Sequence, residues 1–155
     1  MARPREGELA PRFEGVSGDG QRVSLDELLK NGPVMVVFYP KDETAVCTAQ
    51  LCDYRDQYGE FRKLGVQIVG VSGGSASSKD KFSQKHHFPF PLLADEDGRI
   101  AKAYGMRNFL GMTDRGNFLV GRDGKLVYAH KETLPVFRRK SDELLDVARR
   151  HFAAS

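Results

Sequence analysis

The chain has 155 residues, 40% hydrophobic and 29% charged, which is typical of a soluble globular protein with one sizeable core. Its formal net charge of +3 is spread over both signs, so composition gives no reason to expect a nucleic-acid partner. No apolar run approaches the length of about 20 residues that crosses a bilayer, and no apolar segment of a secretory signal follows the charged N-terminus. We therefore expect a single domain over residues 1–155, located in the cytoplasm and without a membrane partner.

The only cysteines are Cys47 and Cys52. Two thiols in a chain expected in the cytosol argue against a scaffold held together by disulfides. They also fall short of the four ligands of a structural zinc site, and none of the four histidines recurs with them at ligand spacing. We therefore expect no metal.

The N-terminal part predicts a hairpin followed by a short helix. Residues 13–23 alternate around the turn-forming segment 17–20. Ser24 and Glu27 have the spacing of a capping box, which predicts a helix through Leu29.

The middle of the chain predicts two buried strands joined by a helix. Residues 34–38 form a β-branched and aromatic run, and 66–71 form a second one. Residues 44–64 between them predict one helix, ended by Gly65. Strand, helix and strand of this size imply a right-handed parallel crossover. An apolar stripe on the helix predicts core packing, with Leu51, Tyr54, Tyr58, Phe61 and Leu64 as its members.

A flexible loop over residues 72–78 comes next, and its last serines can cap a helix that runs to His86 or His87. The loop is rich in glycine but lacks both the P-loop ending and the GxGxxG pattern, so phosphate binding is weakly supported. Residues 88–93 are rich in proline and predict a stiff extended segment. A turn at 95–98 then leads into a helix over about 100–104.

The C-terminal part predicts a hairpin and an amphipathic helix. Strands over 117–120 and 125–128 flank an Asp-Gly turn. The basic run 138–140 predicts a solvated loop, and a helix begins at Ser141. Its expected inward-facing residues are Leu144, Leu145, Val147, Ala148 and Phe152. Together the elements predict an α/β domain whose central mixed sheet combines parallel strands with an antiparallel hairpin.

Cys47 stands out because it follows a buried strand, the turn at Pro40 and the start of a helix. The first turn of a helix favours an anion, and the thiolate is the reactive form of cysteine. Thr44, three residues earlier, can place a hydroxyl beside the sulfur. A buried, inert cysteine is the commoner arrangement, but functional groups collect at strand ends in open α/β sheets. We therefore interpret Cys47 as reactive.

Cys52 is five residues further along the same predicted helix. That spacing separates two side chains by about 7.5 Å along the axis and about 140° around it. A disulfide needs Cα atoms within about 7 Å, so the two thiols can bond only if the first helical turns unwind. From spacing alone, Cys52 is equally compatible with an inert core thiol.

The pattern Pro40-x-x-x-Thr44-x-x-Cys47 resembles the active-site motif of the peroxiredoxins. The string from Phe38 to Cys47, together with Cys52 and residues 54–56, resembles their bacterioferritin-comigratory (PrxQ) branch. Similarity extends over nearly the whole chain, through residues 70–72, 88–93, 101–105 and 115–120.

This resemblance implies a thioredoxin-like fold, with the N-terminal hairpin as an extension, and a role for each matching residue. Cys47 would be the peroxidatic cysteine and Cys52 the resolving one. Thr44 would hydrogen-bond the sulfur and the peroxide, and Pro40 would shape the turn. Arg115 would hold the thiolate and polarise the peroxide, although an arginine is usually a surface residue.

Three positions depart from the family pattern. Gln50 stands where the family often has a glutamate that helps to orient the arginine. The usual Pro-Gly pair before the cysteine is Ala45-Val46 here, and Gly121 replaces a common aspartate.

The function implied is an atypical 2-Cys peroxidase of antioxidant defence, acting on hydrogen peroxide or organic hydroperoxides. Thioredoxin or a glutaredoxin-like dithiol protein would reduce the Cys47–Cys52 disulfide, no cofactor would be needed, and a monomer is expected. A redox-sensing or chaperone-like binding protein switched by the same disulfide is the alternative. A thioredoxin-type oxidoreductase is disfavoured because such sites use Cys-x-x-Cys, and a degenerate homologue with a structural role is a further possibility.

Overall fold

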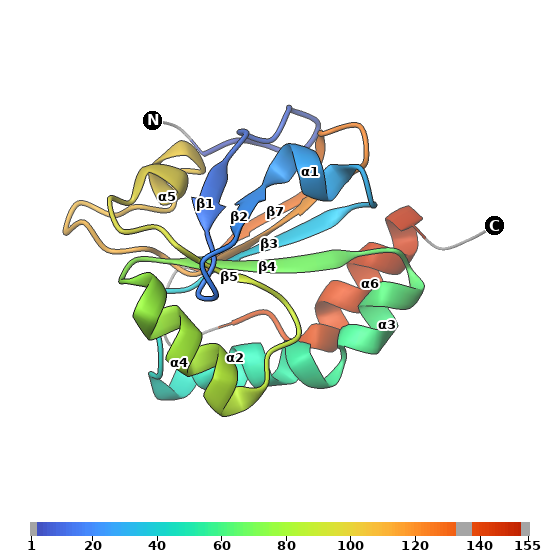
Figure 1. Ribbon diagram of the computed structural model, residues 1–155. Helices are drawn as coiled ribbons and strands as arrows, with labels where there is room; N and C mark the ends of the chain where they lie inside the picture. Colours follow the sequence, from blue (N-terminus) through green and yellow to red (C-terminus); the bar gives the residue numbers. More distant parts are fainter. Residues whose placement is uncertain (1–2, 133–137, 153–155) are drawn as a thin grey trace.

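A computed structural model describes residues 3–132 and 138–152 (Figure 1). Its centre is a five-stranded sheet in the order β5-β4-β3-β6-β7. The central strand β3 (Val34–Phe38) pairs in parallel with β4 (Gln67–Ser72), which pairs in parallel with β5 (Leu92–Ala94). On the other side β6 (Gly116–Val120) runs antiparallel to β3, and β7 (Leu126–Lys131) antiparallel to β6. The expected mixed sheet is confirmed.

Helices cover both faces of this sheet (Figure 1). One face carries four helices: α2 (Ala45–Asp56), α3 (Tyr58–Lys63), α4 (Ala76–His86) and α6 (Ser141–Phe152). The other face carries the shorter elements: α1 (Leu25–Leu29), α5 (Arg99–Ala103) and the hairpin of β1 (Glu14–Val16) and β2 (Arg22–Ser24). The N-terminal hairpin was therefore predicted correctly.

Strand β3 shows why both faces must be covered. Met35 and Val37 belong to the apolar cluster beneath α2, α3 and α6, whereas Val34, Val36 and Phe38 belong to the cluster on the opposite face. All five side chains have no exposed surface. Successive side chains of a strand point to opposite faces, so an uninterrupted apolar run requires a core on each side.

The single helix predicted over residues 44–64 is wrong. The backbone leaves the helical conformation at Gln57 (φ −103°, ψ 7°), which separates α2 from α3. The break lets α3 change direction while the Phe61 N–H still donates to the Gln57 carbonyl at 3.3 Å. The apolar stripe does pack into the core: Leu51, Tyr54 and Phe61 are fully buried, and Tyr58 and Leu64 are partly buried against them.

Smaller differences concern caps and edges. The Ser24 hydroxyl accepts from the Glu27 N–H at 3.1 Å, but the Glu27 carboxylate pairs with Lys30, so half of the capping box forms. The serine that caps α4 is Ser75, earlier in the loop than expected. The end of the extended segment 88–93 joins the sheet in β5. In α6 the expected inward residues do pack inward, with Phe152 partly buried.

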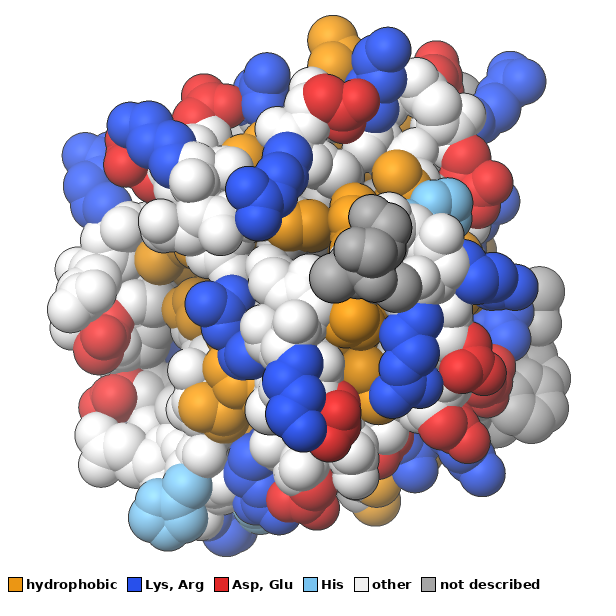
Figure 2. Space-filling view, turned by 90° about the vertical axis from the view of Figure 1, so that its right-hand side faces the viewer, with side chains coloured by type: hydrophobic (Ala, Val, Ile, Leu, Met, Phe, Trp, Pro, Cys, Tyr) orange, Lys and Arg blue, Asp and Glu red, His pale blue; other side chains and the backbone are white. Residues whose placement is uncertain are grey.

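The surface has no dominant charge on the face in Figure 2, where basic and acidic side chains are intermixed around small apolar areas. None of the helices in the described ranges combines the length and apolar character that a membrane-spanning helix requires.

Candidate active site

The site lies where the carboxyl end of β3 meets the amino end of β6. The antiparallel register pairs Phe38 with Gly116 and Val37 with Asn117. Because paired residues share a face, Asn117 lies on the same face as Val37, towards α2, and Arg115 lies on that face two residues earlier. The register therefore brings an arginine 68 residues away in the chain beside the helix that starts after β3.

Cys47 and Arg115 are in direct contact. The Cys47 side chain has no exposed surface, and Arg115 is 3% exposed. An Nη2 hydrogen of Arg115 donates to the Cys47 sulfur at 3.1 Å. Cys47 is the third residue of α2, so its sulfur also lies near the positive end of the helix dipole. A buried guanidinium and a helix N-terminus both favour negative charge on the sulfur.

A chain of hydrogen-bonded polar side chains orients the Arg115 side chain. Arg115 Nη1 donates to the Gln50 side-chain oxygen, and the Gln50 amide donates to the Tyr54 hydroxyl at 3.1 Å. Asn117 donates to the same hydroxyl at 3.3 Å, and that hydroxyl donates to the Arg139 carbonyl at 2.6 Å. Burial raises the pKa of Tyr54, which keeps the hydroxyl protonated. Gln50 thus orients Arg115 without a carboxylate. The sequence did not predict the polar roles of Tyr54 and Asn117, because Tyr54 belongs to the apolar stripe and Asn117 to a strand, and both were interpreted as core.

Thr44 is the N-terminal flanking residue of α2 and is exposed. Its hydroxyl donates to the Lys41 carbonyl at 3.1 Å. Pro40, two residues after β3, lines a cavity of about 210 Å³ that also includes Arg115, Met112 and Thr113 in its wall. A small molecule in this cavity would therefore contact Arg115.

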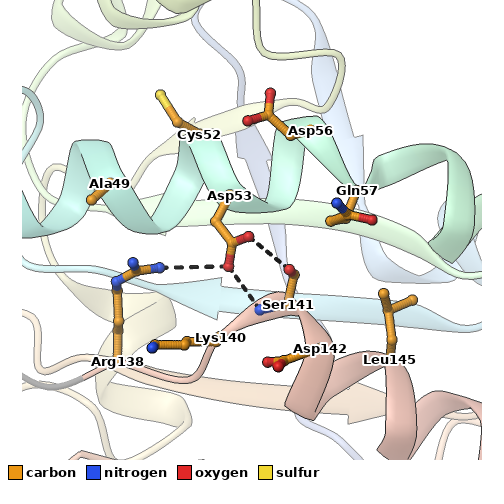
Figure 3. A pocket seen from close by; sticks show the side chains of 10 residues that line it. All are labelled: Ala49, Cys52, Asp53, Asp56, Gln57, Arg138, Lys140, Ser141, Asp142 and Leu145. Carbon is orange, nitrogen blue, oxygen red and sulfur yellow. Dashed lines mark hydrogen bonds and ion pairs between the residues drawn. The ribbon is translucent and has the colours of Figure 1, made fainter.

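Cys52 lies on α2 with its side chain partly buried, and both cysteines are free thiols. Because α2 is continuous from Ala45 to Asp56, the helical separation of about 7.5 Å and about 140° applies to the pair. The Cys52 sulfur lies 3.8 Å from Nδ1 of His86. Cys52 is also one of the residues that line a cavity of about 610 Å³ between α2 and the start of α6, although its sulfur points to the far side of α2 (Figure 3).

Asp53 ties α2 to α6 across this cavity (Figure 3). Its carboxylate accepts from the Ser141 N–H at 2.8 Å and from the Ser141 hydroxyl at 2.7 Å, which satisfies donors at the first turn of α6. Arg138 is 3.5 Å from the same carboxylate, and Arg139 pairs with Glu143 at 2.7 Å. The solvated loop expected at 138–140 is therefore wrong for the two arginines, which are half-buried because acidic partners hold them.

A buried ion pair anchors the turn that precedes α2. The side chain of Lys79 is fully buried, and its ammonium lies 2.8 Å from Asp42 and 2.6 Å from the Gly73 carbonyl. The same carboxylate accepts from Tyr39 at 2.6 Å and from Ser78 at 2.7 Å. Burial lowers the pKa of Lys79, and Asp42 opposes that shift. No sequence signal separates this lysine from its solvated neighbours.

Lys79→Met is expected to destabilise the protein by about 3–5 kcal/mol, because it leaves the Asp42 carboxylate buried without its cation. Urea unfolding would measure the loss. Lys81→Met, an exposed position on the same helix, should stay within about 0.5 kcal/mol of the wild type. Adding Asp42→Asn should recover part of the loss, and a Lys79→Met protein as stable as the Lys81→Met control would contradict this role.

Within residues 3–132 and 138–152, no group of three or more histidine, cysteine or acidic side chains is arranged to hold a metal ion. The chemistry that the described residues offer at this site is that of a thiol beside a guanidinium.

Comparison with known proteins shows what the whole chain is similar to. The model of the AhpC/TSA family matches residues 7–129. Peroxiredoxin Q, chloroplastic, of Suaeda salsa is 39% identical over 132 residues, 83% of this chain and 61% of the relative. The chain thus spans less than two thirds of that relative. A putative peroxiredoxin bcp of Coxiella burnetii is 36% identical over 76% of this chain and 82% of its own length.

Solved structures are similar over nearly the whole length. Peroxidoxin BcpB of Mycobacterium tuberculosis matches with a TM-score of 0.85 and 29% identity, over 94% of this chain and 97% of that one. Peroxiredoxin Q of Xanthomonas campestris matches with a TM-score of 0.81 and 28% identity, over 90% of each chain. These matches confirm the fold class expected from the sequence.

Proposed function

This chain belongs to the AhpC/TSA family, in the branch of the peroxiredoxin Q and Bcp proteins, and we propose that it is a thiol-dependent peroxidase whose nucleophile is the Cys47 sulfur. The observation that carries the proposal is the buried 3.1 Å contact between Arg115 and that sulfur. Burying a guanidinium is costly unless it is paired, and a cysteine that only fills space in the core would not require such a neighbour.

In the oxidation step, the Cys47 thiolate attacks one peroxide oxygen. A sulfur–oxygen bond forms, the oxygen–oxygen bond breaks, and the departing oxygen takes a proton to leave as water or an alcohol. Negative charge moves from sulfur to the departing oxygen, where Arg115, the first-turn N–H groups of α2 and the Thr44 hydroxyl can stabilise it. Thr44 would have to exchange its bond to the Lys41 carbonyl for one to the peroxide. The product is a sulfenic acid on Cys47.

Resolution then requires α2 to open locally. The Cys52 sulfur attacks the Cys47 sulfenic sulfur, the sulfur–oxygen bond breaks, and water leaves as an intramolecular disulfide forms. A dithiol protein such as thioredoxin or a glutaredoxin-like reductant restores both thiols by exchange. Because both cysteines lie on one helix, the cycle is complete in a monomer, and a cytoplasmic location would supply the reducing thiols it needs.

Organic hydroperoxides are included in the proposed substrates. Phe109 and Leu110 are 96% and 70% exposed. They line a cavity of about 640 Å³ that shares Asn108, Asp114 and Glu132 with the cavity at Arg115. An apolar substituent can therefore rest on this loop while the peroxide group reaches the site. One of the similar Xanthomonas campestris structures is described in terms of alkyl peroxide reduction by that protein.

Mass spectrometry of the protein after one equivalent of peroxide tests the proposal. We expect the mass to fall by two hydrogens and a peptide to contain an internal Cys47–Cys52 link. In a separate turnover assay with a thioredoxin system, we expect consumption of hydrogen peroxide and of cumene hydroperoxide. A link between two chains would contradict local opening of α2. Absence of consumption with both peroxides would contradict the peroxidase itself.

A further inference from the structure

We propose that His86 is the proton acceptor that converts Cys52 to the attacking thiolate, a role that rests on the proposed peroxidase cycle and concerns its second step. Cys52 is the group that must attack the sulfenic acid, and a thiol attacks poorly until it has lost its proton. Atom Nδ1 of His86 lies 3.8 Å from the Cys52 sulfur, within the range of a long sulfur–nitrogen hydrogen bond.

The imidazole of His86 packs against two aromatic rings, and the backbone of the residue is anchored to α2. Its ring stacks on Phe88, with centroids 5.5 Å apart and planes at 25°, and meets Phe82 edge to face at 5.4 Å. The His86 carbonyl accepts from Arg55 at 2.7 Å, which ties the end of α4 to α2. Two aromatic contacts and a backbone anchor thus fix the ring with one nitrogen at the sulfur.

The Cys52 side chain lies on the opposite side of α2 from the Asp53–Ser141 bridge (Figure 3). In Figure 3 the Asp53 side chain points from α2 towards Ser141, while the Cys52 sulfur leaves the helix on the other side. Asp53 is engaged with α6 through Ser141, so it has a structural partner of its own. The Cys52 sulfur has His86 from α4 as its neighbour instead.

Charged groups of both signs surround the pair. The pKa of Arg55 is raised, chiefly by its hydrogen bond to Asp56 and in smaller part by Cys52. Lys85, next to His86, pairs with Glu43 at 3.2 Å. The other titratable groups border the cavity at Cys52: Asp53 and Asp56 on α2, Arg138 and Lys140 before α6, and Asp142 within it. Of these, Asp53 is held by Ser141 and Arg138, and Asp56 by Arg55.

The proton balance of the step is simple. Neutral His86 takes the Cys52 thiol proton on Nδ1, which leaves a thiolate beside an imidazolium. When α2 opens, the thiolate forms the bond to the Cys47 sulfur, and the departing hydroxide takes a proton and leaves as water. The imidazolium returns its proton to solvent. No oxidant is needed beyond the peroxide already consumed at Cys47.

The expected gain follows from the thiolate population. An unassisted cysteine titrates near pH 8.5, so only about 3% of it is thiolate at pH 7. A proton acceptor beside the sulfur raises that fraction, and the rate of attack on the sulfenic acid rises with it. Faster resolution shortens the life of the sulfenic acid, which a second peroxide would otherwise oxidise irreversibly to sulfinic acid.

The test measures Cys52 directly in a Cys47→Ser protein, which has a single thiol and needs no peroxide. The rate of alkylation by iodoacetamide is followed from pH 6 to pH 10, alone and combined with His86→Phe or His86→Gln. Phenylalanine keeps the aromatic contacts and glutamine keeps polarity, but neither accepts the proton at neutral pH. We expect the midpoint to rise by about one pH unit in both variants and the rate at pH 7 to fall about fivefold to tenfold.

His87→Asn is the matched control. His87 is exposed, ends α4 with φ 55°, a conformation that asparagine tolerates, and should leave the midpoint unchanged. An unchanged midpoint in both His86 variants, or an equal shift in His87→Asn, would overturn the assignment.

With Cys47 present, His86→Phe should accumulate sulfenic and sulfinic acid at pH 7 but not at pH 9, while its first oxidation keeps the wild-type rate. Equal accumulation at both pH values would also count against His86. A wild-type protein that consumes no peroxide would refute the peroxidase and leave the alkylation result standing.

Discussion

Cys47→Ser is expected to lower peroxide turnover by about a factor of 10⁶, the lower end of enzymatic rate enhancements, because a serine hydroxyl at neutral pH cannot replace the thiolate as nucleophile. Cys52→Ser is the matched partner. It keeps the nucleophile and its arginine, so Cys47 should be oxidised once and then stop. Peroxide consumption with a thioredoxin system measures both variants, and dimedone labelling detects the trapped sulfenic acid in Cys52→Ser.

The pair of variants also separates the rival functions. A redox switch would form the same disulfide but would turn peroxide over slowly even as the wild type. A protein with a purely structural role would show no difference between the two variants. Full activity in Cys47→Ser would refute the assignment of the nucleophile.

Arg115→Ala is expected to slow the oxidation of Cys47 by about 10²–10³-fold, the usual cost of removing one donor from the site where negative charge develops. Arg115→Lys keeps the charge but loses the planar fork that donates to Cys47 and Gln50 together, so it should recover only part of the rate. Stopped-flow measurement of the second-order rate constant with hydrogen peroxide follows this step alone.

Arg122→Ala provides the control for Arg115. Arg122 is exposed and follows β6 at the opposite end of the sheet from Arg115, so its loss should leave the rate constant unchanged. Circular dichroism shows whether Arg115→Ala keeps its helices. Unchanged kinetics in a folded Arg115→Ala protein would remove the guanidinium from the proposed chemistry.

Local sequence patterns predicted most elements because each depends on neighbours in the chain. The buried run 34–38, the Asp-Gly hairpin and the amphipathic helix at the C-terminus carry their own periodicity. The break at Gln57 carries no clear signal, since the nearest glycine, Gly59, lies inside α3 and not at the break. Phe61 is fully buried after the break, so the change of direction is compatible with core packing.

The candidate site was predicted in part, and the division has a physical reason. Cys47 could be identified because a strand, a turn and a helix start are local signals. Arg115 was identified only by family resemblance, because its approach to Cys47 depends on the register of β3 with β6. The buried Lys79 had no signal, because a lysine is exposed in most contexts. Its burial depends on Asp42, 37 residues away in the chain.

The bridge from Asp53 to Ser141 couples the local opening of α2 to the start of α6. Asp53 is adjacent to Cys52, and it secures the first turn of a helix 88 residues away in the chain. If α2 unravels to let the sulfurs meet, that anchor is released at the same moment, and the amide hydrogens at the start of α6 lose protection together with those of α2. Two segments remote in the chain then behave as one cooperative unit whose opening is set by the redox state of a single residue pair.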